Sequence, residues 1–180
     1  MTCIVGMIEK NKVYIGGDSA GVSGLNVTVR KDTKVFKVGK FIIGCTSSFR
    51  MIQLLRFSFH PPKKHEDTDL YQYMCTDFVN ALLSCFKDGG FAEINSSVEN
   101  GGTFLVGVDG RLFTIGDDFQ VGESADGFDS VGCGSSFSKG ALHILKDQKL
   151  SPESKIKIAL ESAVRFSGGV RPPFVIENEQ

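Results

Sequence analysis

The first eighteen residues contain two short apolar runs joined by a charged turn. The runs cover residues 2–8 and 12–17 and are together enriched in Val, Ile and Tyr, which are residue types that favour strands. Thr2 stands directly behind Met1, and Asp18 lies just past the second run. This pattern predicts a β-hairpin at the start of a domain.

Thr2 gives the hairpin a second interpretation. Methionine removal tolerates a small second residue such as Thr, and we expect it to leave Thr2 as the N-terminus. The α-amine, with an ordinary pKa of about 7.7–8.0, would then lie on the same residue as the hydroxyl. Such a residue carries a nucleophile and a general base side by side. For the hairpin alone, an ordinary surface threonine is the simpler interpretation, so the rest of the chain must decide.

A lysine and a run of small residues follow the hairpin. Lys34 lies just before a strand-like segment, and residues 44–48, Gly-Cys-Thr-Ser-Ser, follow an apolar one. Thr2, Asp18, Lys34 and this run have the order and spacing found in the proteasome β-type threonine peptidases. The chain resembles this family, and most closely its bacterial HslV type.

The resemblance extends over nearly the whole chain. Residues 132–135, Gly-Cys-Gly-Ser, stand before an expected helix, and residues 166–169, Phe-Ser-Gly-Gly, lie near the end. These glycine motifs support the resemblance through their order along the chain.

Composition limits the partners of the chain. A net charge of −1 and a pI near 6.3 argue against nucleic acid and against an anionic membrane surface. No apolar run approaches the ~18 residues that a membrane helix needs, and no signal peptide is visible. The five cysteines are odd in number and not closely spaced, which is typical of reduced thiols in the cytoplasm. With three scattered histidines, no metal site is expected.

Periodicity and turn residues predict strands, two helices, strands, two helices and a final strand. The expected strands cover residues 2–8, 12–17, 27–30, 34–38, 41–45, 103–108, 111–115, 119–121, 129–131 and 174–176. The expected helices cover residues 48–59, 69–86, 136–145 and 151–166. The Gly- and Ser-rich segment 19–26 is expected to be a loop. This order by itself predicts an α+β fold.

The resemblance implies a more specific architecture. It implies a four-layer αββα sandwich, in which two antiparallel sheets are flanked by helices, as in the N-terminal nucleophile hydrolases. The length of 180 residues suits a single domain of this type over residues 1–180.

The resemblance also implies catalytic roles. Thr2 would carry the nucleophilic hydroxyl, with its own amine as the base. Lys34 would lower the pKa of that amine and favour the developing alkoxide, and Asp18 would hold Lys34 in place and protonated. The backbone N–H of Ser47 would face the oxygen of the tetrahedral intermediate. Cys133 stands where the family has a serine that hydrogen-bonds the N-terminal residue.

Two further residues, Cys45 and Phe49, are expected near the first substrate pocket. Bulky Phe49 stands where the family residue is small, which would narrow that pocket. Simpler interpretations exist for all of these positions. Lys34 would be a solvated strand lysine, and Cys45, Ser47 and Phe49 would pack a strand against a helix.

Several positions depart from the family pattern. Ser47 replaces a glycine of the HslV type, and Cys133 is a weaker hydrogen-bonding partner than the serine it replaces. Val164 stands where many proteasome-type relatives have Asp, although HslV-type chains also lack that Asp. A retained Met1 would block the amine of Thr2.

We therefore expect a threonine endopeptidase subunit that assembles into a self-compartmentalising homo-oligomeric ring and cleaves polypeptide substrates. In the family a separate ring ATPase feeds these substrates, and the sequence has no phosphate-binding loop of its own. No cofactor is implied. One alternative is a catalytically inactive proteasome-like ring or scaffold protein, which the departures fit. Another is an N-terminal nucleophile amidase that acts on a small amide.

Overall fold

The computed structural model describes residues 1–91, 93–95 and 98–179, and the strands paired within these residues are antiparallel. One sheet has the order β12-β1-β2-β13, with bounds Phe128–Gly132, Cys3–Glu9, Lys12–Gly17 and Val175–Asn178. The second sheet has the order β11-β10-β9-β6-β5, with bounds Val121–Glu123, Arg111–Ile115, Phe104–Val108, Phe41–Cys45 and Val35–Val38. Two separate hairpins pair β3 with β4 and β7 with β8, with bounds Ala20–Ser23, Asn26–Val29, Glu93–Asn95 and Val98–Asn100.

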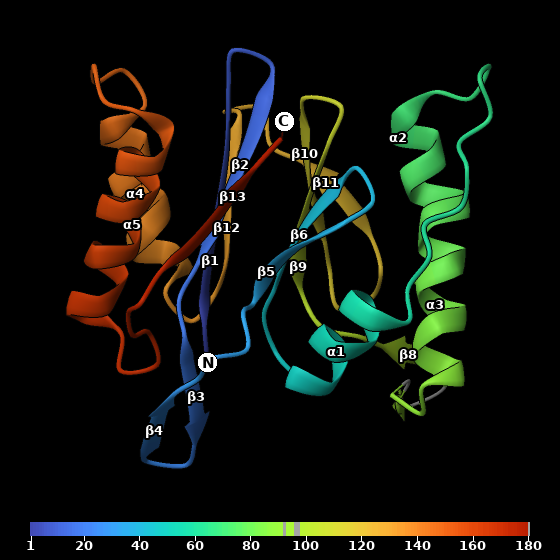
Figure 1. Cartoon of the computed structure of the whole chain (residues 1–180), viewed down its shortest axis with the longest axis horizontal. Helices are drawn as coiled ribbons and strands as arrows, with labels where there is room; N and C mark the ends of the chain where they lie inside the picture. The colour runs from blue at the N-terminus through green and yellow to red at the C-terminus, as the bar shows by residue number, and fades with distance from the viewer. Residues whose placement is uncertain (92, 96–97, 180) are drawn as a thin grey trace.

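Helices lie on the outer sides of the two sheets (Figure 1). Two of them, α4 (Ser135–Leu145) and α5 (Pro152–Phe166), lie beside the first sheet. On the far side of the second sheet lie α1, α2, a π-helical turn and α3, with bounds Phe49–Phe57, Leu70–Tyr73, Met74–Phe78 and Val79–Asp88. No helix in the described residues has the length and apolar character needed to cross a membrane.

Polar side chains mark where two helices begin. The Asp69 carboxylate accepts a hydrogen bond from the Tyr71 N–H at 2.8 Å, and the Ser151 hydroxyl accepts one from the Ser154 N–H at 3.2 Å. These contacts satisfy N–H groups that have no partner inside the helix. The helix expected over residues 69–86 is present, but the π-helical turn interrupts it.

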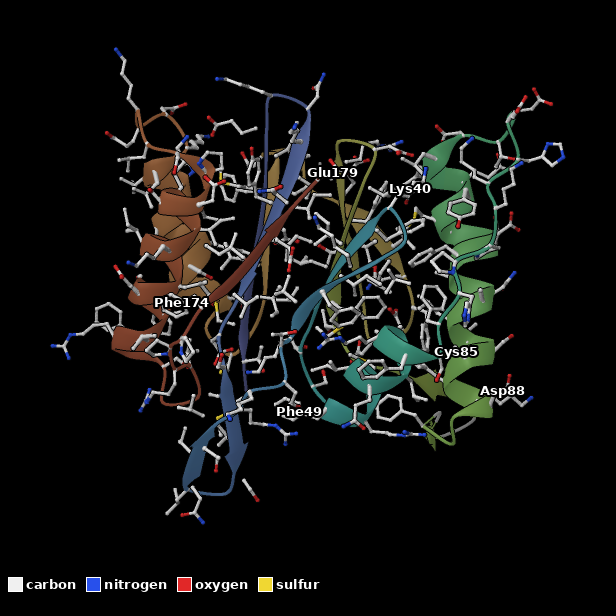
Figure 2. All side chains as sticks on the ribbon, viewed as in Figure 1. Lys40, Phe49, Cys85, Asp88, Phe174 and Glu179 are labelled. Atoms are coloured by element: carbon white, nitrogen blue, oxygen red, sulfur yellow. The ribbon has the colours of Figure 1, made fainter. Side chains whose placement is uncertain are left out.

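Apolar side chains fill the space between the sheets and the spaces under the helices (Figure 2). The cluster that joins the two sheets consists of Ile4, Val13, Ile15, Val35, Ile42, Leu105, Leu112 and Val131. Two glycines set how closely the sheets approach. A Cβ atom on Gly44 would lie 2.5 Å from Cγ2 of Ile4, and one on Gly107 would lie 2.5 Å from Cγ1 of Val13. Larger residues there would force the sheets apart.

The segment 19–26 differs from the expectation of a loop. Residues 20–23 form β3, which pairs with β4 (residues 26–29) in a hairpin that projects beyond the first sheet (Figure 1). Gly24, in the turn between them, has a φ of 58°, a conformation that glycine adopts without strain. The glycine and serine content therefore reflects a tight hairpin, which forms one side of a groove described below.

Candidate active site

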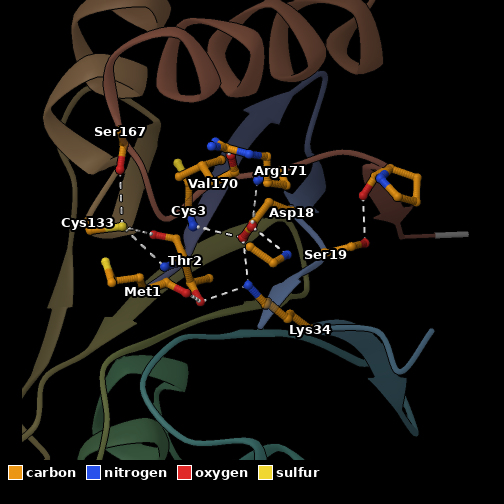
Figure 3. Close-up of polar contacts among 12 residues, drawn as sticks. Met1, Thr2, Cys3, Asp18, Ser19, Lys34, Cys133, Ser167, Val170 and Arg171 are labelled. Atoms are coloured by element: carbon orange, nitrogen blue, oxygen red, sulfur yellow. Dashed lines mark hydrogen bonds and ion pairs between the residues drawn. The ribbon is translucent and has the colours of Figure 1, made fainter. Parts of the chain in front are cut away.

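Thr2, Asp18 and Lys34 come together in the interior of the molecule (Figure 3). Thr2 precedes β1 and Asp18 follows β2, and the pairing of Ile4 with Gly17 brings them to the same end of the first sheet. Lys34 directly precedes β5 of the second sheet. The antiparallel hairpin and the stacking of the sheets thus join three positions that are distant in the sequence.

Asp18 accepts four hydrogen bonds. Its Oδ1 atom accepts from Lys34 Nζ at 2.8 Å and from the Cys3 N–H at 3.0 Å. Its Oδ2 atom accepts from the N–H groups of Ala20 and Arg171, at 2.9 and 3.1 Å. All four partners are donors, so only an ionised carboxylate, which accepts at both oxygens, satisfies them.

Lys34 is 1% exposed and joins Asp18 to the threonine. Its Nζ atom lies 2.9 Å from Thr2 Oγ1 and 2.8 Å from Asp18 Oδ1. Burial lowers the pKa of Lys34, while the charge and hydrogen bond of Asp18 oppose that change. The ammonium is therefore held where it can stabilise negative charge on the threonine oxygen.

Thr2 is buried, whereas Met1 is exposed. The Thr2 hydroxyl donates to the Met1 carbonyl oxygen at 2.5 Å, and the Thr2 N–H donates to Cys133 Sγ at 3.3 Å. In this state the Thr2 nitrogen belongs to a peptide bond, so it is not basic. The hydroxyl and the lysine are in place, and a free amine requires loss of Met1.

Cys133 and Ser167 approach Thr2 from the side of α4 and α5 (Figure 3). The Cys133 thiol donates to the Thr2 carbonyl oxygen at 3.4 Å and lies 3.3 Å from Ser167 Oγ. Ser167 directly follows α5, in the Ser-Gly-Gly segment. The Cys133 thiol therefore borders the nitrogen that would become the amine, and the Ser167 hydroxyl contacts that thiol.

Ser47 has a φ of 65°, in the left-handed region that glycine adopts most readily. The backbone at Ser47 thus has a conformation that suits glycine, the residue that the resemblance to the HslV type implies at this position. Within the described part of the chain, the Ser47 N–H donates no hydrogen bond. Gly132 lies between the neighbouring residue Thr46 and Thr2. A Cβ atom on Gly132 would lie 3.2 Å from Thr46 Cγ2 and 2.3 Å from the Thr2 carbonyl oxygen, so Thr46 lies close to the Thr2 segment.

Phe49 and Cys45, both expected near a substrate pocket, have different surroundings. Phe49 lines a groove next to the β3–β4 hairpin, and its ring centre lies 5.9 Å from Lys34 Nζ. Cys45 is fully buried in the cluster between the second sheet and α1–α3, and burial raises the pKa of its thiol. The simpler interpretation, packing of a strand against a helix, describes Cys45.

Two contributors to the site were missed in the sequence. Arg171 supplies a backbone N–H to Asp18, and a backbone donor leaves no trace in residue type. Ser167 was assigned no role, although its position in the Ser-Gly-Gly segment could have indicated its contact with Cys133. In the described residues, no group of three or more His, Cys, Asp or Glu side chains is placed to hold a metal ion.

Gly132→Ala tests how tightly the turn before α4 holds Thr2. Gly132 has a φ of 96°, and a Cβ atom there would lie 2.3 Å from the Thr2 carbonyl oxygen. We expect the free energy of unfolding, measured by urea denaturation, to fall by about 1–3 kcal/mol, because the backbone must either shift or stay strained. Gly140→Ala, in open space on α4, is the control and should not destabilise. Equal stability of the two variants would contradict this close contact.

Several solved structures have a similar fold. BPH from Thiobacillus denitrificans in complex with epoxomicin has a TM-score of 0.82 at 17% identity, covering 98% of this chain and 97% of that chain. HslV from Trypanosoma brucei has a TM-score of 0.70 at 18% identity, covering 98% of each chain. Anbu, an ancestral β-subunit, from Yersinia bercovieri has a TM-score of 0.66 at 15% identity, covering 98% of this chain and 81% of that chain.

These likenesses show the fold. The mixture of helices and antiparallel sheets is confirmed, and the fold is similar to those of BPH and HslV. The resemblance to HslV predicted from the sequence is confirmed over nearly the whole chain at the level of structure. No family model and no curated protein sequence matches the chain.

Proposed function

We propose that this chain is a threonine-type endopeptidase subunit in which Thr2 becomes the nucleophile after removal of Met1. The observation that carries the proposal is the buried chain of contacts from Thr2 Oγ1 to Lys34 Nζ to Asp18. Structural ion pairs also occur in protein interiors, but this one ends on a threonine hydroxyl next to the N-terminus. A free amine on Thr2 would complete the set of groups that acyl transfer requires.

The reaction would proceed through an ester. The Thr2 hydroxyl attacks the substrate carbonyl carbon while its proton passes to the Thr2 amine. Lys34 stabilises the developing charge on Oγ1, and the Ser47 N–H faces the oxygen of the tetrahedral intermediate. The proton then passes to the leaving amine, and the acyl group stays on Thr2. Water, activated by the same amine, releases the acyl group as a carboxylic acid.

The assembly is part of the proposal. We assign the layers to the four-layer αββα sandwich of N-terminal nucleophile hydrolases, formed by a single domain over residues 1–180. We infer a homo-oligomeric ring in the cytoplasm that encloses polypeptide substrates, with a separate ring ATPase as a possible partner. Exposed phenylalanines on the helices beside the first sheet, Phe137 and Phe166, with ring centres 5.4 Å apart, are consistent with self-association.

A catalytically inactive ring or scaffold protein is the second candidate. Two observations favour it. The Thr2 hydroxyl donates a hydrogen bond to the Met1 carbonyl oxygen. The thiol of Cys133 stands where the resemblance implies a serine, whose hydroxyl is a stronger hydrogen-bonding group. Both candidates share the fold and differ in whether the Thr2 amine is released.

Intact mass spectrometry with epoxomicin separates the two candidates. We expect the purified protein to have lost the ~131 Da of a Met residue, because the proposed chemistry needs the free amine. Incubation should then add the mass of one epoxomicin molecule, which reacts with both the amine and the hydroxyl of an N-terminal threonine. Thr2→Ala, which also permits Met removal, is the control and should gain no mass. Met-free protein that gains no mass would support the scaffold.

A further inference from the structure

A groove lies between the β3–β4 hairpin and the start of α1. Its volume is about 430 Å³, and its lining includes Val22, Thr28, Arg30, Asp32 and Phe49. Figure 2 shows Phe49 at the start of α1, on the side that faces the hairpin. The groove is therefore formed by the β3–β4 hairpin, of which the sequence predicted only the second strand, and by a residue expected near the substrate.

The groove borders the proposed nucleophile. Lys34 Nζ lies 5.9 Å from the centre of the Phe49 ring and 2.9 Å from Thr2 Oγ1. Phe49 thus lines the groove and lies near the lysine that contacts Thr2. A peptide held with its carbonyl at Thr2 would place a neighbouring side chain in this space.

Arg30 is held in a fixed orientation in the groove. Its guanidinium carbon lies 3.7 Å from the centre of the Phe49 ring, a stacking arrangement that suits the planar cation. Its Nε and Nη2 atoms donate to the two oxygens of Asp32 at 2.8 and 2.7 Å. Its Nη1 atom donates to no other residue among those described. Arg30 therefore presents a preoriented donor that is available to a ligand.

Positive charge exceeds negative charge around this groove. Hydrogen bonding by Arg30 holds the pKa of Asp32 below its ordinary value, and the charge of Arg56 adds to that effect. Lys31, between Arg30 and Asp32 in sequence, is exposed. The carboxylate that lines the groove thus lies near two arginines. An added carboxylate would be favoured here over an added ammonium.

We propose that this groove binds an acidic side chain of the polypeptide substrate and that Arg30 is the residue that determines this specificity. The inference rests on the proposed peptidase function. The methylene groups of a glutamate would pack against Val22 and Phe49, and its carboxylate would accept a hydrogen bond from Arg30 Nη1. The substrate class is therefore a peptide with Glu or Asp close to the cleaved bond.

Three peptides test the proposal. They are tripeptide aminomethylcoumarin amides that differ only in the residue before the cleaved bond, which is Glu, Gln or Lys. For Met-free protein we expect kcat/KM for the Glu peptide to exceed that for the Gln peptide about tenfold, because a charge-assisted hydrogen bond is stronger than a neutral one. The Lys peptide should be the poorest substrate. Equal rates for the Glu and Gln peptides would overturn the proposal.

Matched variants locate the effect. Arg30→Gln should bring the Glu-to-Gln ratio close to one, whereas Lys31→Gln removes the same charge from an exposed neighbour and should keep the ratio. Asp32→Asn should raise the ratio, because the amide keeps one accepting oxygen, frees one Arg30 donor and removes the negative charge that neutralises Arg30. A ratio that is unchanged in Arg30→Gln would show that the preference, if present, arises elsewhere and would also overturn the proposal.

A binding measurement separates this inference from the proposed function. Titration calorimetry of the uncleaved peptide amides with Thr2→Ala protein requires no catalysis and should show the same order of affinity. Met-free protein that cleaves none of the peptides, while Thr2→Ala still prefers the Glu peptide, would contradict the peptidase and leave the groove's selectivity standing. Equal affinities for the Glu and Gln peptides would remove the selectivity even if cleavage occurs.

Discussion

Asp18→Asn is expected to lower the free energy of unfolding by about 3–5 kcal/mol, the usual range when one partner of a buried ion pair is removed. The substitution barely changes side-chain volume, so the loss reports hydrogen bonding and charge. Asp18 faces Lys34 and three backbone N–H groups, all of them donors. An amide has one accepting oxygen, and its NH₂ group would meet two of these donors. Urea denaturation measures the change.

Stability of this variant should depend on pH in a defined direction. Burial lowers the pKa of Lys34, and Asp18 opposes that shift, so without the carboxylate the folded-state pKa of Lys34 falls further. The unfolded chain then binds this proton more tightly than the folded one, and stability rises as pH increases toward the ordinary value of 10.5. Asp109→Asn, in an exposed pair with Lys40, is the control and should change stability by less than about 1 kcal/mol. Similar losses in the two variants would contradict the buried network.

Much of the fold was predictable from short sequence patterns, such as apolar runs that flank turn residues. The first hairpin and the strands around Asp109 and Gly110 follow from apolar runs flanking turn residues. A strand was predicted over residues 27–30 and is present as β4. Its partner β3 was missed because the glycine and serine content of residues 19–26 resembles that of a loop, and the burial of β3 depends on other elements. The π-helical turn at residues 74–78 was not predicted, because the helical spacing of apolar residues continues through it.

The site divides in the same way. Thr2, Asp18 and Lys34 were identified by the resemblance to the threonine peptidases, whose order and spacing they share, and the structure brings them within hydrogen-bonding distance. The N–H of Arg171 depends on where the chain passes after α5, and no residue type encodes that. The sequence predicted Arg30 only as the last residue of a strand over residues 27–30. Its stacking on Phe49 depends on how the hairpin packs next to α1, which the sequence does not show. The family resemblance therefore predicted the contacts among Thr2, Lys34 and Asp18, while the backbone donors to Asp18 and the neighbouring groove required coordinates.

Lys34→Met is expected to reduce kcat/KM for peptide hydrolysis by at least about 10³-fold, as when a group that stabilises the transition state is removed. Met occupies a similar volume without the ammonium, so neither the charge beside Thr2 Oγ1 nor the hydrogen bond of 2.9 Å remains. Loss of the ammonium leaves the buried Asp18 carboxylate unpaired and should lower the free energy of unfolding by about 3–5 kcal/mol. Asp18 keeps its three backbone donors, so we expect the variant to remain folded, as circular dichroism can verify. Thr2→Ala should lose at least as much activity, because it removes the nucleophile itself.

Lys37→Met supplies the matched control for this loss. Lys37 lies on β5 close to Lys34 in sequence, is exposed, and forms a long 3.8 Å ion pair with Glu177. The same chemical change there should leave kcat/KM within about twofold of the unmodified protein, since exposed ion pairs contribute little. If Lys34→Met retained the activity of Lys37→Met, the ammonium would have no part in the reaction. The contact between Lys34 and Thr2 would then be structural, and the inactive ring or scaffold protein would become the better account of this fold.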